Sequence, residues 1–367
     1  MTVVDTDVLA ALHGRSMLLT DEWSVTELEA LCEVAERLEQ LDRHGLATPL
    51  LGGELHYGLF FDNSTRTKSS WAGASVRLGG TPMVVDGSST QVAHGETAEE
   101  TGAMLGMNAH ALGIRHDLIL GEGNRFMRGV KSGIETYLSA RGDDRVVPVV
   151  NLQCDIDHPT QTLADLCWLR ERFPDGLRGR TMTVSWAYSP SYAKPLSVPQ
   201  GLITLLTRLG MHVRLAHPPG YALMPQCIES AEAHAHESGG SFTVGHDMAE
   251  AFDGADIVYP KSWGPFDLML ARRNEPHRLK EIEAEALERN RQHRSWICDE
   301  QKMALTRDGG ALYMHCLPAD IGAEVSAGVM ERARLDVARE ANKKVYVIMA
   351  LLAAAKVRNL AEQLERA

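Results

Sequence analysis

The sequence predicts an α/β protein of two domains, each built on a parallel sheet flanked by helices. At 367 residues, with 44% hydrophobic and 23% charged residues, the chain is larger than one core of ordinary size requires. Strand-like apolar runs alternate with amphipathic runs of helical period along most of the chain. Alternation of this kind is typical of parallel α/β sheets.

The first domain begins with an amphipathic helix over residues 24–41, which follows the helix-start residues Thr20 and Asp21. The runs that follow predict strands at 57–61, 81–85, 111–114 and 146–151, and helices at 68–78, 97–107, 133–141 and 160–171. A second series, after a Phe-Pro-Asp-Gly turn at 173–176, predicts strands at 181–186, 211–216, 257–259 and 311–315, and a helix at 198–209. A last helix at 344–364 is expected to pack back on the first domain.

Composition excludes several classes of protein. The formal net charge of -12 argues against a nucleic-acid or anionic-membrane partner. Residues 1–12 lack the pattern of a signal peptide, and the longest apolar run, 345–355, is too short to span a bilayer, so a cytoplasmic protein is expected. The six cysteines contain no C-x-x-C pair and are expected to be reduced thiols that bind no metal.

The turn Ser64-Thr65-Arg66-Thr67 follows the first predicted strand and opens a helix. Hydroxyls, a guanidinium and free backbone N–H groups at a helix start form an oxyanion site, although Ser and Thr are also ordinary capping residues. Arg115 closes a predicted strand, where ligands bind in open α/β sheets, and His158 and Gln161 bracket a helix start. The turn after His315 leaves backbone carbonyls free to accept hydrogen bonds. Taken singly, each residue also has a structural interpretation: Arg115 as a surface charge, His158 as a helix cap and His315 as a core histidine.

Together the Ser-Thr-Arg-Thr, His-Pro-Thr-Gln and His-Cys-Leu-Pro motifs resemble those of the aspartate and ornithine carbamoyltransferases, in the same order. The resemblance implies a carbamoyl-phosphate domain at 1–160, on which 341–367 packs, and a second-substrate domain at 161–340. It implies Arg66, Arg115 and His158 as catalytic residues and no metal or organic cofactor. It also implies a set of carbamoyl-phosphate-binding residues: Ser64, Thr65, Arg66, Thr67, Gln91, His94, Arg115, His158, Gln161, Cys316, Leu317 and Lys344.

The segment 88–97 resembles the family loop that reaches into a neighbouring subunit, which implies a homotrimer in which Gln91 and His94 cross the interface. A mobile surface turn is the alternative interpretation. The C-terminal Arg of the ornithine enzymes is replaced here by Lys343 or Lys344.

The second half departs from the ornithine pattern. The Asp-bearing Ser-Met-Gly loop that pairs the ammonium of ornithine is replaced by 255–265, which carries Lys261 and Trp263, and no aspartate-specific arginine pattern is found. We expect Lys194, Lys261 and Trp263 to contact the second substrate. A cation at this place favours an anionic or ureido ligand over an α-ammonium.

The loop 186–199 resembles the proline-containing loop of the knotted branch, which includes N-acetylornithine and N-succinylornithine carbamoyltransferases, and this implies a trefoil knot in the second domain. A Pro-rich connector is the alternative. The amino-acid sequences of segments 91–97 and 151–161 are similar to those of the knotted transcarbamylase group found with bacterial purine-catabolism genes. That similarity implies a role in purine or ureide nitrogen catabolism.

We therefore expect a carbamoyltransferase whose partners are carbamoyl phosphate and an amine or ureide that is neither ornithine nor aspartate. The alternative is a catalytically inactive carbamoyl-phosphate-binding subunit with a regulatory or assembly role. A dinucleotide-binding dehydrogenase is excluded because no G-x-G-x-x-G follows a strand near the start of the chain.

Overall fold

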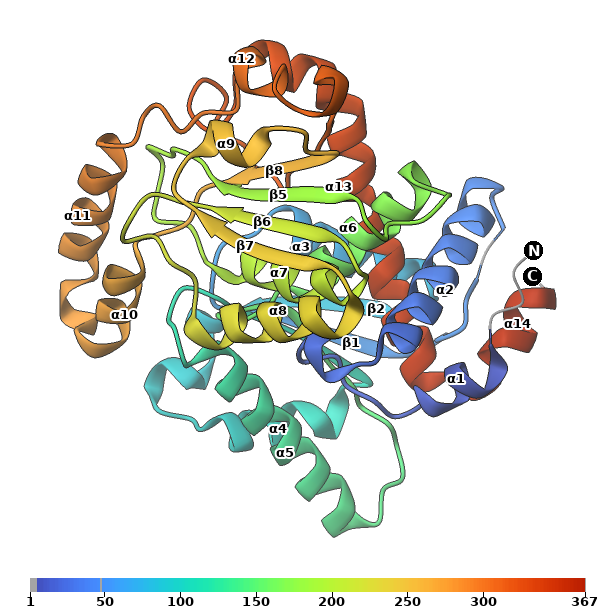
Figure 1. Ribbon diagram of the computed structural model, residues 1–367. Coiled ribbons are helices and arrows are strands. Elements are labelled where there is room, and N and C mark those ends of the chain that lie inside the picture. The colour runs from blue at the N-terminus through green and yellow to red at the C-terminus, as the bar shows by residue number, and fades with distance from the viewer. Residues whose placement is uncertain (1–4, 47, 367) are drawn as a thin grey trace.

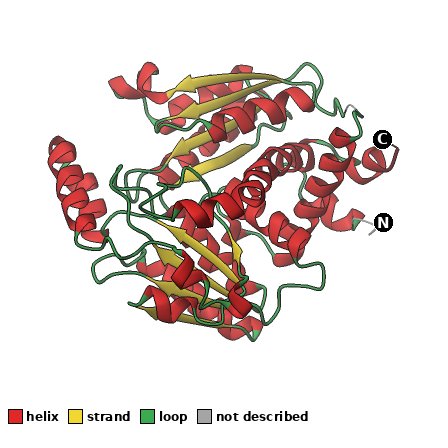
Figure 2. Ribbon diagram, turned by 90° about the horizontal axis from the view of Figure 1, so that it is seen from above, coloured by secondary structure: helices red, strands yellow, loops and turns green. Residues whose placement is uncertain are grey.

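The computed structural model describes residues 5–46 and 48–366. Two parallel sheets carry the fold, and Figure 2 shows them in separate halves of the molecule. The predicted architecture of two α/β domains with parallel sheets flanked by helices is confirmed. We expect no signal peptide in the segment 1–12, of which residues 1–4 lie outside the described part. Residue 367, the last of the segment 341–367 that is predicted to pack on the first domain, also lies outside it.

The first sheet has the strand order β2-β1-β3-β4, and every pair is parallel. Because parallel strands end at one edge, the turn after β1, the end of β3 and the segment after β4 lie together. The elements are β1 Leu55–Phe60, β2 Thr81–Asp86, β3 Ala111–His116 and β4 Val149–Cys154, with α1 Thr6–Ala11, α2 Val25–Arg43, α3 Arg66–Arg77, α4 Ala98–Asn108, α5 Gly123–Arg141 and α6 Pro159–Arg172.

The second sheet has the order β7-β6-β5-β8-β9 and is also parallel. Strands β5 and β8 are buried along their whole length, as expected for inner strands of a parallel sheet that is covered on both faces. The elements are β5 Thr181–Trp186, β6 His212–Ala216, β7 Ser241–Gly245, β8 Ile257–Lys261 and β9 Leu312–Tyr313, with α7 Ser197–Arg208, α8 Pro225–Ser238, α9 Met248–Phe252, α10 Phe266–Asn274, α11 Leu279–Arg291, α12 Glu300–Met303, α13 Ala327–Lys356 and α14 Leu360–Arg366.

Helix α13 is the long helix that crosses the molecule in Figure 1, and it packs on α2, α3 and α6. We expected one helix over 344–364, whereas α13 begins at Ala327, ends at Lys356 and is followed by the separate helix α14. The start was missed because many side chains before Lys343 are exposed and polar, so that half has no apolar run. Val357, with φ -101° and ψ 107°, separates the two helices.

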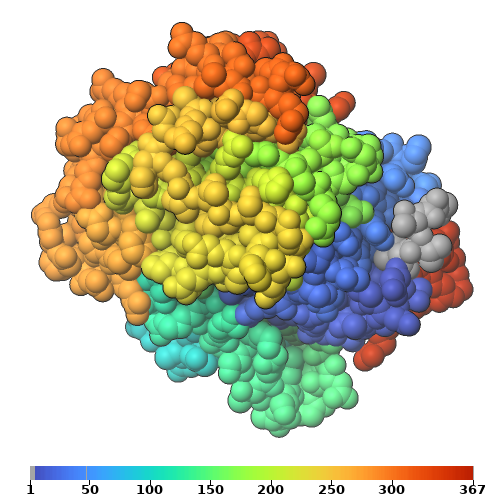
Figure 3. Space-filling view, in the orientation of Figure 1, coloured from blue at the N-terminus to red at the C-terminus, as the bar shows by residue number. Residues whose placement is uncertain are grey.

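Helix α5 begins ten residues before the predicted helix 133–141, at Gly123. Its glycines read as helix breakers, but at Gly133 a Cβ would lie 2.0 Å from the carbonyl oxygen of Glu99, so this residue permits the close contact with α4. Helix α8 and strand β7 were not predicted. In Figure 3 the end of α5 protrudes at the lower edge of the molecule.

The loop 186–199 is held between segments that are distant in sequence. The Tyr188 amide donates to the Trp296 carbonyl at 2.7 Å, and the Gly264 amide donates to the Lys194 carbonyl at 2.9 Å. The trefoil knot stays a prediction. Across the described ranges, no helix combines the length and the apolar character that a membrane crossing requires.

Candidate active site

One cavity of about 310 Å³ collects most of the predicted site residues from both domains. It lies where the turn after β1, the end of β3 and the start of α6 meet the segments that follow β5, β8 and β9. The lining residues are Asn63, Ser64, Thr65, Arg66, Thr67, Arg115, Gln153, His158, Gln161, Tyr192, Lys194, Pro195, Val198, Lys261, His315, Cys316, Leu317, Pro318 and Lys344.

The Ser64–Thr67 turn opens helix α3. The Ser64 hydroxyl accepts a hydrogen bond from the Thr67 amide at 3.2 Å, so Ser64 does cap the helix, and the turn also lines the cavity. The two interpretations of this turn are therefore compatible. Arg66 donates from Nη2 to the Leu317 carbonyl at 2.7 Å, a hydrogen bond that joins the two domains across the cavity.

Arg115 stands at the end of β3 and is 9% exposed. Its Nη2 lies 2.7 Å from Oδ2 of Asp117, a fully buried carboxyl group. Burial raises the pKa of Asp117 well above its ordinary value, while the Arg115 guanidinium acts in the opposite sense. This contact fixes Arg115 at the wall of the cavity.

His158 precedes α6 and is 3% exposed. Burial lowers its pKa well below the ordinary value, and the neighbouring cations Lys344 and Arg115 add to the effect. The imidazole is therefore neutral near pH 7 and keeps one N–H to donate. Its Nδ1 lies 3.3 Å from the Thr160 hydroxyl.

Gln161, in the first turn of α6, is 1% exposed. Its Nε2 donates to Oδ1 of Asp165 at 2.6 Å, and its Oε1 is buried without a hydrogen-bond partner among the described residues. The turn that carries Cys316 and Leu317 is held by His315, whose Nδ1 accepts from the Leu317 amide at 2.8 Å.

The structure distinguishes the two C-terminal lysines. Lys343 pairs with Glu39 and Glu171 and faces a different hollow, between α2 and α6. Lys344 lines the cavity, and its Nζ makes no hydrogen bond or ion pair within the described part of the chain. Burial, with the nearby guanidiniums of Arg66 and Arg115, lowers the pKa of Lys344 to about 8.

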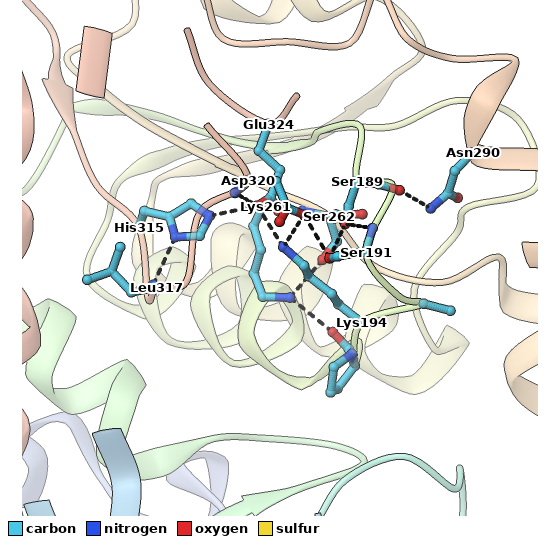
Figure 4. A network of polar contacts seen from close by, with 12 residues as sticks. Ser189, Ser191, Lys194, Lys261, Ser262, Asn290, His315, Leu317, Asp320 and Glu324 are labelled. Carbon is cyan, nitrogen blue, oxygen red and sulfur yellow. Dashed lines mark hydrogen bonds and ion pairs between the residues drawn. The ribbon is translucent and has the colours of Figure 1, made fainter. Parts of the chain in front are cut away.

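The predicted second-substrate residues have different surroundings. Lys194 lines the cavity, but its Nζ lies 2.7 Å from Oε2 of Glu324 and 3.0 Å from Oδ2 of Asp320 (Figure 4). Burial alone would raise the pKa of Glu324, but the His315 imidazole, 3.7 Å from Oε2, and the hydrogen bond from Lys194 hold it below the ordinary value. Lys194 is thus neutralised by the protein.

Lys261 has no carboxylate partner among the residues that the structure describes. Its buried Nζ donates to the carbonyls of Ser262 at 2.8 Å and Pro195 at 3.2 Å, and burial lowers its pKa. Trp263 is fully buried but does not line the cavity, because its indole is packed in the second domain and donates to the Tyr221 carbonyl at 2.8 Å.

Gln91 and His94 do not line the cavity of their own chain. Both are exposed, in a 3-10 turn that precedes α4. The structure therefore places them outside the cluster that the other predicted phosphate residues form.

Several residues at the site were not predicted. Gln153 lies on β4 and donates from Nε2 to the Ser197 hydroxyl at 2.9 Å, while Tyr192 belongs to the loop after β5. Asp165 stands one turn beyond Gln161 on the same helix face, a spacing from which it could have been found. Glu324 has no comparable sequence signal, since only the tertiary fold brings it to Lys194.

The charge of the cavity has one sign. Within the described ranges, its lining includes the cations Arg66, Arg115, Lys194, Lys261 and Lys344 and no carboxylate. Such a lining favours an anionic ligand.

Comparisons with known proteins agree with this geometry. Residues 15–171 match the family described as aspartate/ornithine carbamoyltransferase, carbamoyl-P binding domain, and residues 196–355 match the Asp/Orn binding domain of the same family. The chain is 47% identical to "Putative carbamoyltransferase YgeW" of Escherichia coli K12, over 94% of this chain and 90% of the relative. It is 32% identical to N-acetylornithine carbamoyltransferase of Xanthomonas campestris, over 93% and 97%.

Solved structures give the same assignment. Acetylornithine transcarbamylase complexed with acetylcitrulline superposes with a TM-score of 0.77 at 30% identity, over 93% of this chain and 99% of that one. Ornithine carbamoyltransferase from Pyrococcus furiosus gives 0.75 at 26% identity, over 94% and 97%. The chain belongs to the aspartate/ornithine carbamoyltransferase superfamily and is a carbamoyltransferase.

Proposed function

We propose that this enzyme moves a carbamoyl group between carbamoyl phosphate and an amine or ureide that is neither ornithine nor aspartate. The observation that carries the proposal is the cavity itself, in which the Ser64–Thr67 turn, His158 and the Leu317 carbonyl meet an unneutralised Lys261. The first three fit the donor, and the lysine fits an acceptor with an anionic or carbonyl group.

The phosphate of carbamoyl phosphate binds at the start of α3. Backbone N–H groups and the helix dipole favour a dianion there, and the guanidinium of Arg66 pairs two phosphate oxygens at once. The Lys344 ammonium, which has no acceptor in the described protein, supplies a second positive charge.

The carbamoyl end lies toward α6. The neutral imidazole of His158 and the guanidinium of Arg115 donate to the carbonyl oxygen, and attack by the acceptor nitrogen places a negative charge on that oxygen. The carbon–oxygen bond to phosphate then breaks, phosphate leaves with the electron pair, and the leaving phosphate takes the proton that the attacking nitrogen gives up. The carbamoyl NH₂ donates to Gln161 Oε1 and to the Leu317 carbonyl, which exchanges its hydrogen bond from Arg66 for one from the ligand.

The acceptor binds near Lys261. No lining residue of the described chain carries a carboxylate that would pair the α-ammonium of ornithine, and a second ammonium beside Lys261 would be repelled in a poorly solvated site. A small ureido acid, or its amine, presents a carboxylate or carbonyl instead. Lys194 contributes less, because Glu324 and Asp320 already pair it. Purine or ureide nitrogen catabolism supplies molecules of this type.

The exposed Gln91 and His94 suit a loop that completes the site of a neighbouring subunit in a homotrimer. Their position outside the cavity of their own chain supports this arrangement.

The test is a panel assay in both directions. Carbamoyl phosphate is offered with ornithine, aspartate, other amines and oxamate, and phosphate or arsenate is offered with diureidopropionate and carbamoylated diamino acids. We expect turnover of a ureido acid and none of ornithine or aspartate. A discrimination of about 10⁴-fold is within the range of a buried polar mismatch. Lys261→Met is the matched variant and should lose the preferred substrate, whereas efficient carbamoylation of ornithine would contradict the assignment of Lys261.

A further inference from the structure

Two buried carboxyl groups, Asp165 and Glu340, lie behind the cavity and have no role in the chemistry above. Asp165 is on α6, one turn after Gln161, and Glu340 is on α13, one turn before Lys344. Both are 0% exposed, and each carboxyl group influences the pKa of the other. Neither lines the cavity.

The two carboxyl groups differ in how readily they ionise. Both oxygens of Glu340 lie 3.1 Å from the His315 amide, and Oδ1 of Asp165 accepts from Gln161. Burial raises the pKa of both groups, and the neighbouring Asp165 raises that of Glu340 further. The hydrogen bond from Gln161 favours the ionised form of Asp165, whose pKa is raised to about 7, whereas that of Glu340 is raised well above its ordinary value. Asp165 is therefore the more readily ionised group of the pair.

The hydrogen bond to Asp165 decides which way the Gln161 amide points. A carboxylate only accepts hydrogen bonds, so it selects the Nε2 end of the amide, at 2.6 Å. The Oε1 end is then fixed on the other side. This oxygen is buried and has no partner in the described residues, although Gln161 lines the cavity. A buried acceptor in this state calls for a donor from a ligand.

We infer that Asp165 is a positioning residue that holds Gln161 with its carbonyl oxygen toward the ligand, so that the site accepts an acyl phosphate only when its acyl group carries an N–H donor. Carbamoyl phosphate has this donor, and an acetyl phosphate of nearly the same shape does not. The inference rests on the proposed function, in which Gln161 faces the carbamoyl NH₂. Glu340 supports it because it is the less readily ionised group of the pair.

The experiment compares two unreactive ligands, phosphonoacetamide and acetonylphosphonate. The second has a CH₃ group where the first has NH₂. Calorimetry on the whole protein should show that the wild type binds the amide about 10- to 100-fold more tightly, because the methyl group leaves Gln161 Oε1 unsatisfied. In Asp165→Leu the Gln161 amide is free to turn, and the ratio should fall below about threefold. Asp165→Asn offers the Gln161 amide a donor as well as an acceptor, so its ratio should lie between those of the wild type and Asp165→Leu.

Asp157→Asn is the matched control. Asp157 is also buried and hydrogen-bonded, to the Thr20 amide and hydroxyl at 2.8 Å, but it does not line the cavity. Its variant should keep the wild-type ratio of the two affinities. A role of Asp165 in stability alone would weaken both ligands equally and leave that ratio unchanged.

The outcomes separate this inference from the proposed function. If the wild type binds neither ligand, the carbamoyl-phosphate site itself is wrong. If it binds both equally, or if Asp165→Leu keeps the wild-type ratio, the positioning role is overturned while the phosphate site stands. Should Asp165→Leu fail to fold, phosphonoacetate is measured on the wild type. A fixed Oε1 repels its carboxylate, so binding as tight as that of the amide would overturn the inference.

Discussion

The unpaired ammonium of Lys344 predicts that the affinity for carbamoyl-phosphate analogues falls as the pH rises through 8. The pKa of Lys344 is lowered to about 8 by burial and by the neighbouring Arg66 and Arg115 guanidiniums. A bound phosphonate favours the ammonium form, so its pKa rises in the complex. The free enzyme must then take up a proton on binding at any pH above about 8.

The magnitude follows from the titration of one group. With a pKa of about 8, the fraction of Lys344 that is charged is about 0.9 at pH 7 and about 0.09 at pH 9. The affinity for phosphonoacetamide should therefore fall by about tenfold over this range. Calorimetry in two buffers of different ionisation enthalpy would give both the affinity and the number of protons taken up.

Lys344→Arg is the matched control, because its guanidinium stays charged over this range while the phosphonate and the other residues titrate as in the wild type. The difference between the two proteins isolates Lys344. If wild type and Lys344→Arg lose affinity in parallel, or if no proton is taken up at pH 9, the reasoning about Lys344 is refuted.

Further predictions concern activity, assembly and stability. Arg66→Ala should reduce kcat/KM by on the order of 10²-fold or more with little change in Tm, and near-normal turnover would contradict the phosphate role of Arg66. Light scattering should give a trimer, and mixtures of Arg66→Ala with His94→Ala subunits should regain activity through hybrid sites; an active monomer would exclude sharing. In urea titrations at pH 7, Lys344→Met should raise the free energy of unfolding by about 3 kcal/mol, which is the energy that corresponds to lowering the pKa of Lys344 from 10.5 to about 8. A less stable variant would count against the low pKa. Glu324→Gln should lower that free energy by about 3 kcal/mol, because the buried Lys194 loses the nearer of its two carboxylate partners and keeps only Asp320, and an unchanged free energy would contradict this role of Glu324.

The sequence predicted the parts of the fold that local pattern determines. Strand β1 ends in the apolar residues Leu59 and Phe60, and β5 alternates polar and apolar residues between two turns. The Ser64–Thr67 turn needs only a strand before it and a helix after it. Elements whose residue types are determined by tertiary contacts or by exposure were not predicted correctly. Helix α5 contains glycines because α4 packs against them, and the first half of α13 has no apolar run because much of it is exposed.

The same distinction applies to the site. Arg115, His158 and Gln161 were recognised because each stands at the end of an element, where the chain itself directs the side chain. The state of Lys194 was not predictable in this way. Its partner Glu324 lies 130 residues away in the sequence, and only the packed second domain brings the two together. Trp263 was expected at the substrate for its place in a loop, and its burial follows from tertiary packing.

The carboxylate of Glu324 links residues of the acceptor pocket so that they depend on one another. It accepts hydrogen bonds from Lys194 Nζ, the Ser262 amide and the Asp320 amide, each at 2.7 Å, and so joins three separate segments (Figure 4). Lys194 and Glu324 can therefore change only as a pair, whether in natural divergence or in redesign of the pocket. Lys261 is not constrained in this way, because among the described residues its Nζ donates to main-chain carbonyls and not to a carboxylate. An attempt to give this enzyme a new acceptor should begin at Lys261 and leave the other two residues in place.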